Sequence, residues 1–399
     1  MPTNLNSSDK GHSNFVSYLS IGLIVLWCAT FPAKGAFFQL SLYLIPVLAL
    51  SLPGHRESFT RFVKPIFIPL GMLVALPLFV SAFVAYVVRD VPVDKEVFDV
   101  FWRLVLFPTA LVVLCLKSNI SALRLQLIFI STALVYALAG LIDMFYGMSF
   151  DGRDWGMRAA GLIGNPNPFG FLMASASVVA LNLLFVIGHQ RYTYWVAIAF
   201  MLFFIAWVFS GSRAAGLALG LGLLMVLFFH RDKLAVIISA QKWRLFLVIA
   251  ALLGLFFVAP LGLFEIVDDS LLRSVFDDLR YNIWSYYLVE IQDYLWIGRG
   301  VDEINRFPHR GNLYGPHNLY LEIVLKAGVI GLLAFGLCML IILKQFYSSI
   351  RAEGMISTVL LIMLLAYNFF GTSLLGNELS QGVFTLLLAF YMMGSTDKP

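Results

Sequence analysis

A histidine that could act as a general base lies where a long polar segment meets an apolar run. The sequence there is Gly315-Pro316-His317-Asn318. Proline favours the first turn of a helix, so His317 is expected at a helix start. The positive end of the helix dipole disfavours an imidazolium ion, which would keep the ring neutral and able to accept a proton. The alternative is a purely structural histidine.

An arginine that could bind an anion opens another apolar run, in Ser210-Gly211-Ser212-Arg213. The serines are suitable N-caps. Free backbone N–H groups at a helix N-terminus, together with Arg213 in the first turn, would form a small anion site. The alternative is an arginine that only snorkels to the membrane interface.

The segment from Arg158 to Pro168 is dense in Gly, Asn and Pro, which predicts a fixed loop. Arg158, Asn165 and Asn167 are candidate substrate-binding residues in this loop, and Asn318 is a further one beside His317. Asn165 and Asn167 would bind sugar hydroxyls or cap the next helix, and capping is the favoured interpretation.

A third arginine is placed by an amphipathic helix that begins near residue 268. Arg273, Asp277, Arg280 and Trp284 share one face of this helix by their spacing. Asp277 can hold one arginine while the other faces a ligand, and Arg280 is the expected ligand.

Neither a metal nor another cofactor is expected. The acidic pairs at 268–269 and 277–278 are adjacent in sequence, so on a helix their side chains diverge instead of meeting at one ion. Arginine can neutralise a diphosphate directly through bidentate hydrogen bonds.

The elements that must position these residues are membrane helices. With 60% hydrophobic residues, 13% charged residues and a mean hydropathy of +0.87, a water-soluble fold would lack polar covering. The three cysteines lie in apolar blocks, which argues against disulfides and a metal-binding CxxC pair. No nucleic-acid partner is expected.

Apolar runs separated by charged or Pro/Gly breaks predict about twelve transmembrane helices, so the fold class is an all-α integral membrane protein. The predicted spans are 15–31, 36–51, 64–87, 97–115, 121–147, 168–188, 193–209, 213–230, 243–262, 318–345, 355–373 and 379–394. Residues 1–399 are expected to form a single polytopic membrane domain.

The lysines and arginines of the short loops gather on one side, which the positive-inside rule assigns to the cytoplasm. Both termini are then cytoplasmic, the first span stays as an anchor, and residues 263–317 form a large extracytoplasmic segment between spans nine and ten. The outer side has nine arginines and two lysines. A guanidinium group binds phosphate through two hydrogen bonds, so this preference suggests a phosphate ligand. The alternative is pairing with outer acids.

A transporter would place ionisable groups along a path through the bilayer. The membrane interior is nearly free of them here: Arg103 has Asp99 one turn away, and Glu322 has Lys326 at the i, i+4 spacing of a helical ion pair. Charge gathered at one interface instead favours a site that a lipid-linked substrate enters sideways.

The combined pattern resembles the bacterial O-antigen ligases and their relatives, the O-antigen polymerases and O-linked oligosaccharyltransferases. The resemblance covers about residues 160–375. It rests on Ser212-Arg213, Arg280-x-x-x-Trp284, Gly298-x-Gly300 and Pro316-His317-Asn318 followed by Leu321 and Gly328, with their order and sidedness.

This resemblance implies a C-type glycosyltransferase fold in a Gram-negative inner membrane, with the active site facing the periplasm. It implies metal-independent, inverting transfer of O-antigen glycan from undecaprenyl diphosphate to lipid A-core, in lipopolysaccharide biosynthesis. His317 would deprotonate the acceptor hydroxyl while Arg213 and Arg280 hold the diphosphate. The roles of Arg158 and Asn165 rest on their side of the membrane and not on the resemblance.

Three other functions stay open. An O-antigen polymerase or a protein O-oligosaccharyltransferase would use the same lipid-linked donor, and a lipid-linked sugar transporter would belong to a different class. The ligase is preferred because the His317 motif and one dominant outer segment late in the chain fit it better.

Overall fold

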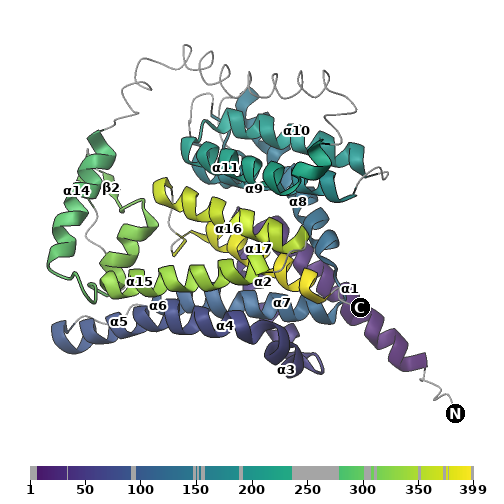
Figure 1. Cartoon of the computed structure of the whole chain (residues 1–399), viewed down its shortest axis with the longest axis horizontal. Coiled ribbons are helices and arrows are strands. Elements are labelled where there is room, and N and C mark those ends of the chain that lie inside the picture. The colour runs from purple at the N-terminus through teal and green to yellow at the C-terminus, as the bar shows by residue number, and fades with distance from the viewer. Residues whose placement is uncertain are drawn as a thin grey trace.

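The structure is a computed structural model, and most of its helices lie roughly side by side in one bundle (Figure 1). It describes residues 7–33, 35–90, 96–146, 150, 152–153, 158–187, 192–235, 278–300, 307–309, 312–348, 352–371, 374–375 and 377–396. The predicted span 243–262 and the expected helix start near residue 268 lie outside these residues.

The first part of the chain is helical, and it includes π-helical turns. In order, the elements are α1 (Ser7–Thr30), α2 (Ala36–Ser51), α3 (His55–Ser58), η1 (Phe59–Val63), α4 (Lys64–Leu70), η2 (Gly71–Ala75), α5 (Leu76–Arg89), α6 (Glu96–Phe101), η3 (Trp102–Leu106), α7 (Phe107–Lys117) and α8 (Ala122–Tyr146). The turns η2 and η3 lie just before Pro77 and Pro108. A proline cannot donate to the carbonyl one turn back and crowds it, so the helix widens there.

The second part of the chain holds the residues of interest for function. Its elements are η4 (Gly161–Ile163), α9 (Pro166–Ile187), α10 (Thr193–Ser210), α11 (Arg213–Phe229), α14 (Asp278–Gln292), β1 (Phe307–His309), β2 (Asn312–Tyr314), α15 (Leu319–Ser348), α16 (Ala352–Phe370) and α17 (Glu378–Thr396). The two strands form an antiparallel hairpin that pairs Phe307 with Tyr314.

Helix α9 is buried over most of its length, between α8, α10, α11 and α16. Phe171 of α9 stacks on Tyr367 of α16, with ring centroids 4.0 Å apart. Gly170 lets the Ser210–Ser212 turn approach, because a Cβ at Gly170 would clash with both serines. The close packing of small residues fixes the start of α11 against α9.

Helix α15 is broken at Gly328, which has φ 69° and ψ −173°. Leu325 and Lys326 lose their helical partners, and their carbonyls accept from the backbone N–H of Arg299 (2.7 Å) and Gly300 (3.2 Å). On the other side of the break, Val329 donates to the Leu295 carbonyl at 2.8 Å. The turn after α14 therefore satisfies the backbone groups that the break exposes.

The predicted single span at 318–345 is thus two helical pieces. The piece before Gly328 packs against α14, and the piece after it runs beside α4 and α5 (Figure 1). The sequence missed the break because the apolar run continues past Gly328 without a proline, and its two charged residues, Glu322 and Lys326, have the spacing of a continuous helix.

A helical, multi-pass membrane protein is confirmed. Among the described residues, six helices are long and apolar enough to cross a membrane, and four shorter apolar helices accompany them. The count of twelve spans and the C-type fold stay predictions.

Candidate functional site

His317 lies two residues before the first residue of α15, next to the N-cap residue, and its side chain is exposed. Its φ of 48° is in the left-handed region, which is uncommon for a residue with a side chain. Such a backbone persists only where neighbouring contacts hold it, and it is often found at functional positions. The Tyr314 ring lies edge-on to the imidazole, with centroids 6.4 Å apart.

Asn318 supplies the contacts that hold this backbone. Its Oδ1 accepts from the N–H groups of Tyr320 (2.9 Å) and Leu321 (3.1 Å), so Asn318 is the N-cap of α15. Its amide donates to the carbonyl of Phe369, in the last turn of α16, at 3.0 Å. The side chain is 4% exposed. These contacts support a positioning role, and direct substrate binding by Asn318 stays a prediction.

Helix α14 is fastened to the same place. Trp284 Nε1 donates to the Pro316 carbonyl at 3.2 Å, and Tyr287 donates to the Tyr314 carbonyl at 2.8 Å. The Trp284 ring also lies against Phe369 and Phe370. Arg280 lies about one turn before Trp284 in α14. Its backbone is therefore about 6 Å along the helix from Trp284, the residue that contacts Pro316. The Arg280 side chain lies outside the described residues.

Arg213 is the first residue of α11, and its side chain is exposed. Ser212 is the predicted N-cap: its Oγ accepts from the N–H of Ala215. Ser210 Oγ accepts from the N–H of Ser212 at 3.2 Å, and Gly211 takes the positive φ of 60° that the turn requires. The sequence therefore predicted this helix start correctly.

Arg158 approaches the same turn from the loop before α9. Its Nε donates to the Ser210 carbonyl at 2.8 Å, and its Nη2 donates to Asn167 Oδ1 at 3.0 Å. Burial lowers the pKa of the Arg158 guanidinium, and the positive charge of Arg213 lowers that pKa further. The structure thus brings Arg158, Asn167 and the start of α11 together.

The two asparagines of this loop have different contacts. Asn165 Oδ1 accepts from the Asn167 N–H at 3.0 Å, at the start of α9, which agrees with the capping interpretation. Asn167 is exposed and orients Arg158. Substrate binding by either asparagine stays a prediction.

Asp143, near the end of α8, was missed by the sequence analysis. Its Oδ2 accepts from the N–H groups of Ala160 (3.1 Å) and Gly161 (2.9 Å), and the side chain is 4% exposed. The Ala159 N–H donates to the Phe209 carbonyl at 2.9 Å, next to the turn that carries Arg213. A lone acid at a helix end gives little sequence signal, because such residues usually face water.

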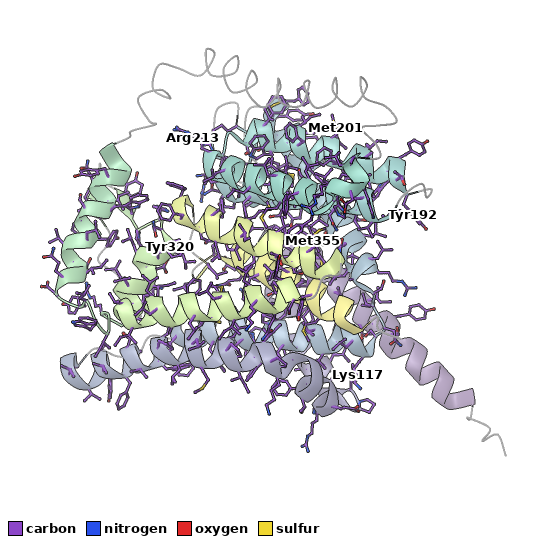
Figure 2. All side chains as sticks on the ribbon, in the orientation of Figure 1. Lys117, Tyr192, Met201, Arg213, Tyr320 and Met355 are labelled. Carbon is purple, nitrogen blue, oxygen red and sulfur yellow. The ribbon has the colours of Figure 1, made fainter. Side chains whose placement is uncertain are left out.

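Helix α16 connects the histidine and the arginines. A Cβ at Gly222 of α11 would clash with Met363 of α16, so these residues lie at one level. Along α11, Arg213 lies nine residues, or about 13 Å, before Gly222. Along α16, Phe370 lies seven residues, or about 10 Å, after Met363. Arg213 and Tyr320 both lie toward the end of the bundle opposite Lys117 (Figure 2). We call this end of the bundle the α14 end.

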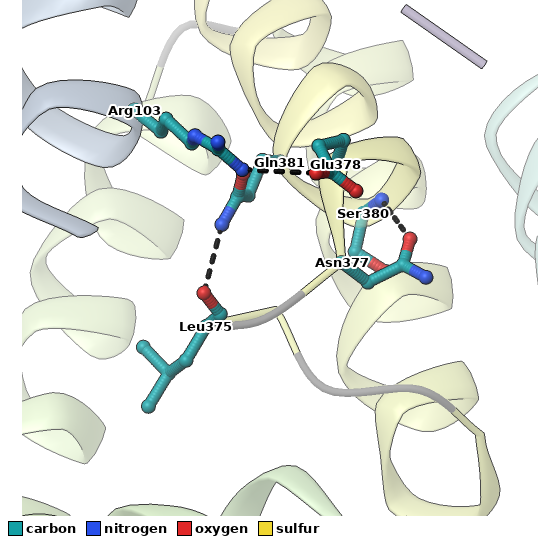
Figure 3. A network of polar contacts seen from close by, with 6 residues as sticks. All are labelled: Arg103, Leu375, Asn377, Glu378, Ser380 and Gln381. Atoms are coloured by element: carbon teal, nitrogen blue, oxygen red, sulfur yellow. Dashed lines mark hydrogen bonds and ion pairs between the residues drawn. The ribbon is translucent and has the colours of Figure 1, made fainter. Parts of the chain in front are cut away.

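Two ion pairs lie inside the described part of the bundle. Lys326 Nζ lies 2.8 Å from Glu322 Oε1, as the spacing predicted. Arg103 pairs with Glu378 at 3.1 Å, in a polar network at the start of α17 (Figure 3). The sequence had instead suggested Asp99, one turn away, as the partner of Arg103. No group of three or more potential metal ligands occurs among the described residues.

The comparisons with known proteins concern the second part of the chain. Residues 198–336 match the family model described as O-Antigen ligase. Over this range the chain is similar to the O-antigen ligase family. The matched range contains Arg213, Arg280 and His317, whereas Arg158 lies before it. A search of curated proteins finds no match to the chain. This match supports an O-antigen ligase- or polymerase-like enzyme of lipopolysaccharide biosynthesis that uses lipid-linked glycan.

Proposed function

We propose that the chain is an O-antigen ligase of the inner membrane, and that it transfers glycan from undecaprenyl diphosphate to lipid A-core at the periplasmic face. The observation that carries the proposal is the tie between Asn318 and Phe369. That hydrogen bond holds His317 at the α14 end, where α11 begins with Arg213.

The reaction needs one base and one cluster of cations. His317 takes the proton from the acceptor hydroxyl, whose oxygen then forms a bond to the anomeric carbon of the donor sugar. The bond from that carbon to the diphosphate oxygen breaks, and the electron pair leaves with the diphosphate. Arg213 and Arg280 stabilise the negative charge that grows there. A single displacement of this kind inverts the anomeric carbon.

Placement on one side of the membrane is part of the proposal. Positive charge in the short loops assigns the α14 end to the periplasm and both termini to the cytoplasm, with residues 263–317 forming the periplasmic segment. Lipid-linked donor and lipid A-core both lie in the membrane plane and can reach the α14 end sideways. The paired charges at Arg103–Glu378 and Glu322–Lys326 weigh against a transport path.

Reconstitution of the purified protein with undecaprenyl diphosphate glycan tests the function. Lipid A-core, a second lipid-linked glycan and an acceptor protein are offered in separate reactions. A ligase glycosylates lipid A-core. Elongation of the lipid-linked glycan alone would identify a polymerase, and glycosylation of protein alone an oligosaccharyltransferase.

A further inference from the structure

The charge of Arg158 is held in an unusual way. It is partly buried, and both of its acceptors, the Ser210 carbonyl and the Asn167 side-chain amide, are neutral. Among the described residues, no carboxylate lies within ion-pairing distance of it. Removing a guanidinium from water without a counter-charge is costly, and a second cation close by increases that cost.

The second cation is Arg213. Arg158 bonds to the Ser210 carbonyl, three residues before Arg213 in the turn that starts α11. The Nε and one Nη2 hydrogen of Arg158 bond to the protein, and its remaining N–H donors have no acceptor among the described residues. One guanidinium group held in place by Arg158's hydrogen bonds, with that of Arg213 in the first turn of a capped helix, suits a doubly charged anion.

Asp143 holds the loop that presents Arg158. Its carboxylate accepts from two consecutive backbone N–H groups, two and three residues after Arg158. Gly161 has a φ of 53°, and a Cβ there would lie 3.0 Å from the backbone nitrogen of Gly140. The loop is therefore fitted tightly against α8, and a guanidinium that has lost side-chain freedom loses less entropy when a ligand binds.

We propose that Arg158 and Arg213 together bind one phosphate group carried by a lipid, and that Asp143 is the positioning residue for Arg158. The identity of the natural ligand, the donor diphosphate, rests on the proposed function; the phosphate site itself does not. A phospholipid headgroup offers the same chemistry, so the test separates the two sources.

The probe is farnesyl diphosphate, a short prenyl diphosphate, and it is titrated against the full-length protein in phosphatidylcholine nanodiscs. Arg158→Gln is expected to weaken binding at least about tenfold, because a charge-assisted contact is lost. The matched control is Arg153→Gln, which removes the same charge from an exposed position of the same loop. It is expected to change binding by less than about twofold. Equal weakening in both variants, or unchanged binding in Arg158→Gln, overturns the site.

Two further arms complete the experiment. Phosphatidylglycerol that displaces the probe from the wild type, but has no effect in Arg158→Gln, identifies a site for any lipid phosphate; no displacement identifies a diphosphate site. Asp143→Ala should weaken probe binding, whereas Asp143→Asn keeps an acceptor oxygen and should bind like the wild type. Wild-type binding in Asp143→Ala, or weakening in folded Asp143→Asn, removes the positioning role. No acceptor is present, so the result stands even if the proposed transfer reaction fails.

Discussion

The side-chain amide of Asn318 donates to the carbonyl oxygen of Phe369 at 3.0 Å, which joins the residue after His317 to the last turn of α16. The same side chain caps α15 through its oxygen. One buried asparagine therefore fixes the backbone of the proposed base and its place relative to α16, the helix that packs against α11.

Replacing this asparagine tests whether it positions His317. Asn318→Ala should lower the free energy of unfolding by about 1–2 kcal/mol, because the cap is lost. Transfer should fall while binding of donor diphosphate is kept. Thermal unfolding in detergent measures the loss of stability, and the transfer rate is measured beside donor binding. Unchanged thermal stability with lost donor binding would mean that Asn318 is itself a substrate ligand.

The break in α15 depends on one glycine. Gly328→Ala should lower the free energy of unfolding by at least about 1–3 kcal/mol, because φ is 69° and the new Cβ would clash with the Trp296 carbonyl. Gly336, in the same helix, has open space where a Cβ would lie, so Gly336→Ala is the matched control. Its expected effect is neutral or slightly stabilising. Equal midpoints of thermal unfolding in the two variants would contradict the role of the break.

Local features were the ones that the sequence predicted well. The predicted span 36–51 coincides with α2, and the predicted span 193–209 ends one residue before α10 does. Ser212 is the expected cap, and Lys326 has the expected partner. Each of these depends on residues within about one helical turn or on an apolar run, and sequence patterns report both.

The sequence analysis missed contacts between residues that lie far apart in the chain. Glu378, the partner of Arg103, lies 275 residues away in the sequence. The break at Gly328 is stabilised by the turn at 294–300, which the apolar pattern of α15 does not reveal. Asp143 acts on a loop that lies beyond the end of its own helix. Such contacts exist only once the helices have packed, so no local pattern encodes them.

A positive charge without the guanidinium geometry should not support full activity at Arg213 and Arg280, the proposed diphosphate ligands. Arg213→Lys and Arg280→Lys keep a positive charge but lose the bidentate geometry, so each should reduce the rate of transfer at least about tenfold. Initial rates with saturating acceptor measure this effect, with Arg153→Lys as the control. Wild-type rates in both variants would remove these arginines from the site.

Arginine takes the place of a divalent ion in the proposed mechanism. The purified enzyme should therefore keep its full transfer rate in excess EDTA, because guanidinium groups supply the charge that a metal would otherwise supply. The control is a metal-dependent glycosyltransferase in the same buffer. Complete inhibition that magnesium reverses would contradict the arginine mechanism.

The sharpest test of the proposed base is the transfer rate of His317→Ala, measured on the same preparation as donor binding. A general base contributes roughly a hundredfold or more to the rate. We expect the variant to bind the donor diphosphate like the wild type and to transfer glycan to lipid A-core at least about a hundredfold more slowly. A variant that transfers glycan at the wild-type rate would show that His317 is not the base.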